Sequence, residues 1–216
     1  AVPLPHQQEP LAFGTRPDDD RWTAFVAGTR MAFISVQADE AEYYTKIESK
    51  QEQTKLAQGL PNVGDSSKSN KREAETVARL IHTLCQLYSR SGIPFSPCKQ
   101  IGIIVPFRAQ IAMIRKALAE RHIPDTADIT IDTVERYQGS QRDIIIFSTT
   151  VSRPYQLSIL SEPVMTDGRE IDRKLNVALT RARKQFFMTG NETLLRNCTA
   201  YRKFLDFLSK EQILRL

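Results

Sequence analysis

The stretch DIIIFSTT, residues 143–150, is an apolar run rich in isoleucine that ends in two threonines. The run IGIIV, residues 101–105, has the same character. Apolar residues that are continuous rather than alternating predict strands that are covered on both faces, as in a parallel sheet. Three more short apolar runs predict further strands: MAFISV (31–36), ITI (129–131) and QFFMTG (185–190).

Helices are expected between these strands. Asn70 and Glu73 have the spacing of a capping box, and apolar residues then recur at helical intervals until Gly92 and Pro94. A second helix follows Pro106, with Ile111, Ile114 and Leu118 turned inward. Because strand and helix alternate, the sequence predicts an α/β fold of three α/β/α layers around a mainly parallel sheet. Ligands of such sheets bind beyond the carboxyl ends of the strands.

The chain of 216 residues is long enough for one large domain or two small ones. Residues 1–30 are rich in proline and polar side chains, which indicates a linker or tail from an upstream domain. Residues 31–216 are then expected to form the folded domain. Residues 38–68 are charged and rich in glutamine, and we expect a flexible surface insertion there.

The composition of the sequence argues against several classes of protein. No apolar run is long enough for a membrane helix, and the N-terminus does not have the pattern of a signal peptide. The cysteines Cys85, Cys98 and Cys198 form no CxxC pair, which disfavours a metal or redox site and fits reduced thiols in an intracellular protein, cytoplasmic or nuclear. The net charge of +5 is compatible with a polyanionic partner.

The stretch KLNVALTRARKQ, residues 174–185, combines apolar and cationic residues. On a helix over residues 173–184, one arc is apolar and the opposite side is almost wholly cationic. Neither Arg181 nor Lys184 has an acidic partner at i+4. Two interpretations remain open, a solvated outer face or a surface for phosphate, which the guanidinium fork suits well. The apolar arc contains Leu175, Ala178, Leu179 and Ala182, and the cationic side contains Arg173, Lys174, Val177, Thr180, Arg181 and Lys184.

Three segments carry a resemblance to superfamily 1 helicases of the 5′→3′ branch. RKLNVALTRARKQ (173–185) resembles motif VI of that family, and ITIDTVERYQGSQRDIIIFSTT (129–150) resembles motif V. IGIIVPFRAQ (101–110) resembles motif IV, and the SNKREAETV helix (69–77) resembles the segment that opens the same domain. The motifs follow the family's order. The resemblance implies the second of two RecA-like domains, with ATP and Mg²⁺ held mainly by the first domain of the same parent chain.

The family's pattern also implies roles for single residues. Arg181, the arginine of the TRA triplet, would be the catalytic arginine that neutralises charge on the ATP γ-phosphate. Gln110, from motif IV, has an exposed helical position as an equally weighted alternative. Gln141 replaces the family's usual acid, which puts recognition of the sugar in question. Residues implied on the nucleotide side are Lys71 or Arg72 as a second cation, Gln110, Gly139, Gln141 and Arg173. Residues implied to bind single-stranded DNA or RNA are Gln138, Thr149, Thr150 and Arg153, and the two threonines are equally well explained as the end of a strand.

No GxxxxGK[ST] phosphate loop occurs in the sequence, so the expected fold is RecA-like without its P-loop. ADEA, residues 38–41, imitates an acidic Walker B box, but we interpret it as accidental because no P-loop precedes it. The leading hypothesis is the C-terminal motor domain of an ATP-dependent helicase or translocase that is inactive when isolated. The alternative is a non-catalytic nucleic-acid-binding or protein-interaction module that retains the helicase fold.

Overall fold

The computed structural model describes residues 11, 13–36, 68–137, 141–166 and 168–216. The predicted insertion at 38–68, apart from Lys68, and the ADEA stretch lie outside these ranges. Within the described ranges, none of the helices combines the length with the apolar character that a membrane span requires.

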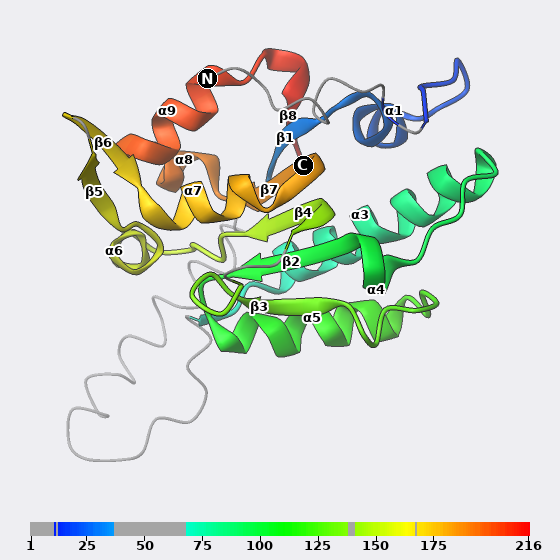
Figure 1. Cartoon of the computed structure of the whole chain (residues 1–216), viewed down its shortest axis with the longest axis horizontal. Coiled ribbons are helices and arrows are strands. Elements are labelled where there is room, and N and C mark those ends of the chain that lie inside the picture. The colour runs from blue at the N-terminus through cyan, green and yellow to red at the C-terminus, as the bar shows by residue number, and fades with distance from the viewer. Residues whose placement is uncertain (1–10, 12, 37–67, 138–140, 167) are drawn as a thin grey trace, which may run out of the picture.

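A six-stranded sheet in the order β3-β2-β4-β7-β1-β8 forms the centre of the molecule (Figure 1). Every pair of neighbours in it is parallel. Its strands are β1 (Met31–Ser35), β2 (Ile101–Val105), β3 (Thr130–Thr133), β4 (Arg142–Ser148), β7 (Ala182–Gly190) and β8 (Ile213–Arg215). A separate antiparallel hairpin contains β5 (Pro163–Thr166) and β6 (Arg169–Asp172).

Helices cover both faces of the sheet, which confirms the predicted three-layer α/β/α fold. One face carries α1 (Arg21–Gly28), α3 (Lys71–Arg90) and α5 (Arg108–Glu120). The opposite face carries α7 (Arg173–Thr180), α8 (Glu192–Leu195) and α9 (Thr199–Phe207). The remaining short elements are α4 (Pro97–Gln100), η3 (Pro154–Gln156), α6 (Leu157–Leu160) and η4 (Lys210–Gln212).

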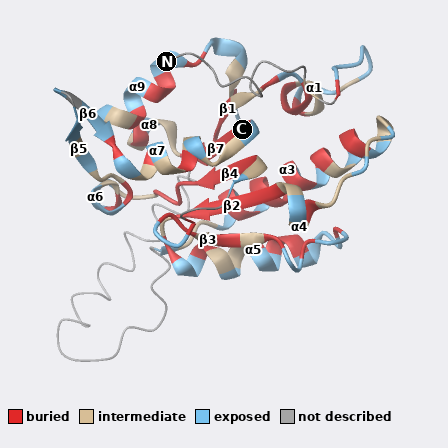
Figure 2. Cartoon of the chain, viewed as in Figure 1, coloured by how far each residue is buried: buried red, intermediate tan, exposed pale blue. Residues whose placement is uncertain are grey.

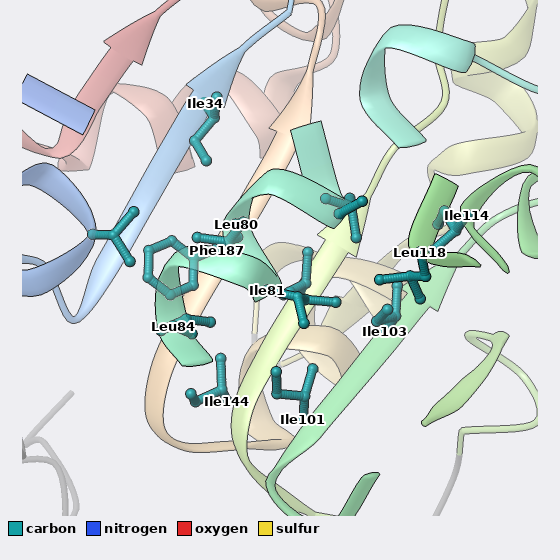
Figure 3. Packing of buried hydrophobic residues seen from close by; sticks show 14 of the residues in the cluster. Ile34, Leu80, Ile81, Leu84, Ile101, Ile103, Ile114, Leu118, Ile144 and Phe187 are labelled. Carbon is teal, nitrogen blue, oxygen red and sulfur yellow. The ribbon is translucent and has the colours of Figure 1, made fainter. Parts of the chain in front are cut away.

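Helix α3 contributes most to the packing on its face. Figure 3 shows that its residues Ile81 and Leu84 lie near isoleucines of β2 and β4, and that Leu80 lies beside Phe187 of β7. All three side chains are fully buried, and burial of one such side chain stabilises a fold by about 1.5–3 kcal/mol. Figure 2 shows that the central strands are buried, whereas the outward faces of the helices are exposed.

The N-terminal part of the chain differs from the predicted linker. Asp20 caps α1 by accepting a hydrogen bond from the Thr23 N–H, and the helix buries Trp22 and Phe25. The Trp22 indole N–H donates to Thr83 Oγ1 of α3 at 2.8 Å, inside the core. Residues from Phe13 to Gly28 therefore contribute to the packed domain, because their apolar side chains are covered by α3 rather than by a local partner.

The predicted helix over 173–184 is too long at its C-terminal end. Helix α7 ends at Thr180, and Ala182 already pairs with Arg142 of β4. Residues 182–184 belong to β7, which pairs with the central strand β4, so tertiary contacts override the helical pattern. Lys184 and Arg181 consequently do not share one helical face.

Candidate functional site

The candidate site residues lie at two opposite edges of the sheet. We call the edge where β2, β4 and β7 end the carboxyl edge, and the edge where β4 and β7 begin the amino edge. Helix α7 starts near the carboxyl edge and runs back to the amino edge (Figure 1). Strand β4 has 7 residues, so at ~3.3 Å per residue the two edges lie roughly 20 Å apart.

Arg181 lies at the amino edge. It follows the last residue of α7, and its backbone carbonyl accepts a hydrogen bond from the Arg142 N–H at 3.0 Å. The residue is half-buried, and its Nε atom is fully shielded from solvent. Among the residues that the structure describes, no hydrogen bond or ion pair reaches the guanidinium group. A shielded guanidinium N–H without an acceptor costs stability, which is a reason to look for a ligand.

The cations around Arg181 in the sequence are all paired. Arg173 contacts Glu162 at 3.4 Å, and Lys174 contacts Glu135 at 3.2 Å. Asp143 of β4 is bound by Lys184 at 3.1 Å and more loosely by Arg183 at 3.9 Å. Acidic partners thus come from distant parts of the chain, which spacing along one helix could not reveal. Arg181 differs from these neighbours by having no carboxylate within the described structure.

Gly139 and Gln141 were expected on the nucleotide side with Arg181, and Gln138 was expected to bind nucleic acid. Gln141 is exposed at the amino edge, directly before β4, and its carbonyl accepts a hydrogen bond from the Arg142 guanidinium at 3.0 Å. The structure therefore brings Gln141 to the same edge as Arg181. Gln138 and Gly139 lie outside the described residues.

The carboxyl edge contains a buried network around Glu73, whose side chain has 0% exposure. Oε2 of Glu73 accepts hydrogen bonds from Ser148 Oγ at 2.8 Å, Thr189 Oγ1 at 3.0 Å and the Thr150 N–H at 3.1 Å. Its Oε1 faces Asn70 Nδ2 at 3.3 Å. One carboxylate therefore joins the start of α3 to the ends of β4 and β7.

Gln110 belongs to the same network and is also fully buried. Its Oε1 accepts from the Asn70 N–H at 2.7 Å, and its Nε2 donates to the Asn70 carbonyl at 3.1 Å and to Ser148 Oγ at 3.2 Å. The predicted capping box is therefore half formed. Asn70 caps α3 by accepting from the Glu73 N–H, whereas Gln110 rather than Glu73 satisfies the Asn70 N–H.

Burial dominates the electrostatics of Glu73. Removal from water raises the pKa of its carboxyl from 4.5 to about 7, and the hydrogen bonds from Thr150, Ser148 and Thr189 act in the opposite direction. Among the described residues no cation pairs with it. The group that faces it from each neighbouring element is a neutral donor.

Thr149 and Thr150 lie at the end of β4 and are fully buried. Thr149 Oγ1 donates to the Thr189 carbonyl at 3.0 Å, and the missing side chain of Gly190 makes room for it. Thr150 adopts a left-handed backbone with φ of +61°, which is uncommon for a β-branched residue. Neither hydroxyl reaches the surface, so the structure offers no direct contact between these side chains and nucleic acid.

The two cations predicted to join Arg181 are not close to it. Lys71 is the first residue of α3, which starts at the carboxyl edge, and its exposed ammonium pairs with Glu75 at 3.6 Å. Arg72 is exposed beside it and borders a hollow with Arg79 and Arg121. The structure therefore separates these residues from Arg181 by the length of the strands.

Arg173 and Arg153 also lie toward the carboxyl edge. Arg173 is exposed at the first position of α7. Arg153 is half-buried in the loop after β4, and its backbone N–H donates to Gln156 Oε1 at 2.8 Å. The structure groups both with the network at the end of β4 rather than with Arg181.

A groove of ≈ 550 Å³ opens at this same edge, beyond β2 and β3. Three cations contribute to its lining, Lys68, Arg108 and Arg136, together with the acidic residue Glu135. Basic side chains suit the phosphates of a single strand. Neither Arg136 nor this groove was predicted from the sequence, because the walls of the groove come from segments far apart in the chain.

Glu73 was named only as a helix cap. A signal for its burial was nevertheless present, because Glu73 precedes Val77 by one helical turn and so extends the apolar stripe of α3. A glutamate on a buried stripe indicates a satisfied polar network.

Comparison with known proteins identifies the family. The sequence model of the family described as AAA domain matches residues 17–193. The putative helicase MOV-10 of Gallus gallus is 32% identical over 155 residues, covering 66% of this chain and 15% of that protein. The DNA polymerase alpha-associated DNA helicase A of Saccharomyces cerevisiae is 34% identical over 103 residues, covering 47% of this chain and 14% of that protein.

A third relative is the DNA replication ATP-dependent helicase/nuclease DNA2 of Bos taurus, 31% identical over 139 residues, with 63% of this chain and 12% of that protein covered. The chain thus spans less than a sixth of each of these relatives. The match to the family covers motifs IV, V and VI and the helix before them. This chain belongs to the AAA domain family and corresponds to the C-terminal RecA-like domain of superfamily 1 helicases.

Proposed function

We propose that this domain supplies the arginine finger of an ATP-dependent helicase or translocase and that Arg181 is that residue. ATP and Mg²⁺ are held mainly by a first RecA-like domain of the same parent chain, which faces the amino edge. The observation that carries the proposal is the shielded Arg181 guanidinium without an acceptor among the described residues, whereas the four other cations of the same sequence stretch, 173–184, are all paired. A positive charge placed in advance stabilises the charge that develops on the γ-phosphate as its bond breaks.

The amino edge provides the supporting groups of this site. Gln141 carries an amide that can donate to and accept from a ribose hydroxyl, without the charge of an acid. The backbone carbonyl of Arg181 is fixed by the Arg142 N–H, so the side chain projects from an anchored position. Gly139 and Gln138 precede Gln141 closely in the sequence, and we retain them as candidates for the nucleotide and the nucleic acid, respectively.

The carboxyl edge is proposed to be the part of the nucleic-acid track that this domain contributes. The groove with Lys68, Arg108 and Arg136 supports this assignment, and Lys71, Arg153 and Arg173 add cations nearby. Thr149, Thr150 and Gln110 then act by shaping this edge from within rather than by direct contact. Strand β4 connects the two edges, so one rigid element runs between the nucleotide and the nucleic acid.

The test is ATP hydrolysis by the full-length protein that contains this chain, in the presence of single-stranded nucleic acid. Arg181→Ala is expected to lower kcat by about 10³-fold or more while the KM for ATP changes little, since the contact forms only in the transition state. Arg183→Ala, an exposed arginine two positions away, is the matched control and should retain near-normal turnover. The 216-residue chain alone should show no turnover.

Equal turnover by Arg181→Ala and the unmodified protein would overturn the arginine-finger assignment. A full-length protein that binds nucleic acid tightly but never hydrolyses ATP would instead favour a non-catalytic binding module with the helicase fold.

A further inference from the structure

The buried network at the carboxyl edge is centred on the carboxylate of Glu73. A carboxylate buried without a cation is costly, and replacement by apolar residues would often stabilise such a site. Here every polar contact of Glu73 comes from a backbone or side-chain group at the end of β4, the end of β7 or the start of α3. Its three donors to Oε2 come from positions more than 70 residues away in the sequence. The carboxylate therefore links three elements at one point.

The turn after β4 depends on this link. Thr150 holds a left-handed backbone, which costs about 1–3 kcal/mol for a residue that is not glycine. Its N–H donates to Glu73 Oε2 at 3.1 Å, and its neighbour Ser148 donates to the same atom. Strain of this kind persists only where the surroundings hold it in place. Glu73 is thus the group that holds the chain in the direction that leads to Arg153.

The start of α3 is fixed by the same network. The Gln110 side chain forms two hydrogen bonds with the backbone of Asn70 and donates a third to Ser148 Oγ. The same Ser148 hydroxyl donates to Glu73. Lys71 follows Asn70 directly. The cations Lys71 and Arg153 are therefore placed on either side of the edge by a network that neither of them joins.

We propose that Glu73 is a positioning residue for nucleic acid: its buried carboxylate fixes the turn after β4 and the start of α3, so that the carboxyl edge presents its cations to a single strand. This inference rests on the proposed function, because it assumes that the carboxyl edge is the nucleic-acid track. It adds a residue that contacts neither nucleotide nor nucleic acid. Arg181, at the other end of β4, is left unaffected.

The test uses the full-length protein and two probes, poly(U) RNA and oligo(dT) DNA, each titrated to stimulate ATP hydrolysis. Glu73→Ala removes the shared acceptor of three donors, so the probe concentration for half-maximal stimulation should rise about tenfold or more. The KM for ATP should stay within about threefold, because the amino edge is distant. Glu73→Gln keeps one oxygen acceptor in the same place and should restore the normal probe concentration.

A structural control separates positioning from general loss of stability. Thr83→Val removes the buried hydrogen bond to Trp22, outside this network, and should leave both half-saturation values unchanged. If Glu73→Ala does not fold, Thr189→Val takes its place, since it removes a single donor and should raise the probe concentration about threefold.

One result overturns this proposal: Glu73→Ala, or Thr189→Val in its place, needs the same probe concentration for half-maximal stimulation as Thr83→Val. A second contrary result is a KM for ATP that rises by the same factor as that probe concentration. Arg181→Ala in the same assay keeps the two questions apart. Its full activity would refute the arginine finger, whatever Glu73→Ala does.

Discussion

The Glu73 carboxylate makes the stability of the domain depend on pH. Burial raises its pKa to about 7, whereas the unfolded chain has the usual 4.5. Between these values the folded state binds more protons than the unfolded state, so the free energy of unfolding falls as the pH rises. The contribution is fully present below pH 4.5 and is lost as the pH passes 7, with a size of about 3 kcal/mol at most.

Glu73→Gln isolates this effect because the amide does not titrate. Urea unfolding of the 216-residue chain at pH 5 and at pH 8 should show a larger loss of stability in the unmodified protein than in the variant. Equal losses in the two proteins would show that Glu73 titrates near its ordinary value in the folded state.

At the scale of elements, α1 is expected to be part of the domain rather than of a linker. Trp22 is buried, bonds to Thr83, and lies with its ring centroid 4.2 Å from the Arg79 guanidinium carbon. Trp22→Ala should therefore cost about 3–5 kcal/mol of stability, measured by chemical denaturation. Phe207→Ala on α9 is the control, since that ring is 77% exposed and its loss should change stability by less than about 0.5 kcal/mol. Equally small losses of stability in Trp22→Ala and Phe207→Ala would indicate that residues 13–28 are a linker.

The elements that the sequence revealed are those with a strong local pattern. Strand β2 spans the predicted IGIIV run, and α3 starts one residue after the predicted cap at Asn70. Helix α1 was missed because it has only 8 residues and directly follows the polar stretch RPDDD (16–20), and its covering surface comes from α3. The end of α7 was misplaced because residues 182–184 belong to β7, and the formation of β7 depends on its pairing with the distant strand β4.

The candidate site was predictable only in part, because its contacts also join segments that are distant in the sequence. Arg181 followed from its motif, but its lack of an acceptor emerged only when the partners of Arg183 and Lys184 were known. Thr149 and Thr150 were correctly placed at a strand end, yet their burial follows from contacts with Thr189 and Glu73. Spacing along a chain indicates which residues share an element, and it does not indicate which donors and acceptors meet across the sheet.

At the scale of the whole molecule, the two edges of the sheet are proposed to have different roles, one toward the nucleotide and one toward the nucleic acid. Arg181 and Gln141 lie where β4 begins, and the Glu73 network lies where it ends. Strand β4, which is buried along most of its length, joins the two edges, and a change in the Glu73 network is expected to act at the carboxyl edge alone. We therefore predict that, in this domain, only the amino edge contacts the γ-phosphate.

The most direct measurement of that claim is the affinity of the full-length protein for ADP with aluminium fluoride, which imitates the transferring phosphate, compared with ADP alone. The unmodified protein should bind the mimic at least about a hundredfold more tightly than ADP, and Arg181→Ala should lose most of that difference while its affinity for ADP stays the same. An undiminished preference for the mimic in Arg181→Ala would contradict the account.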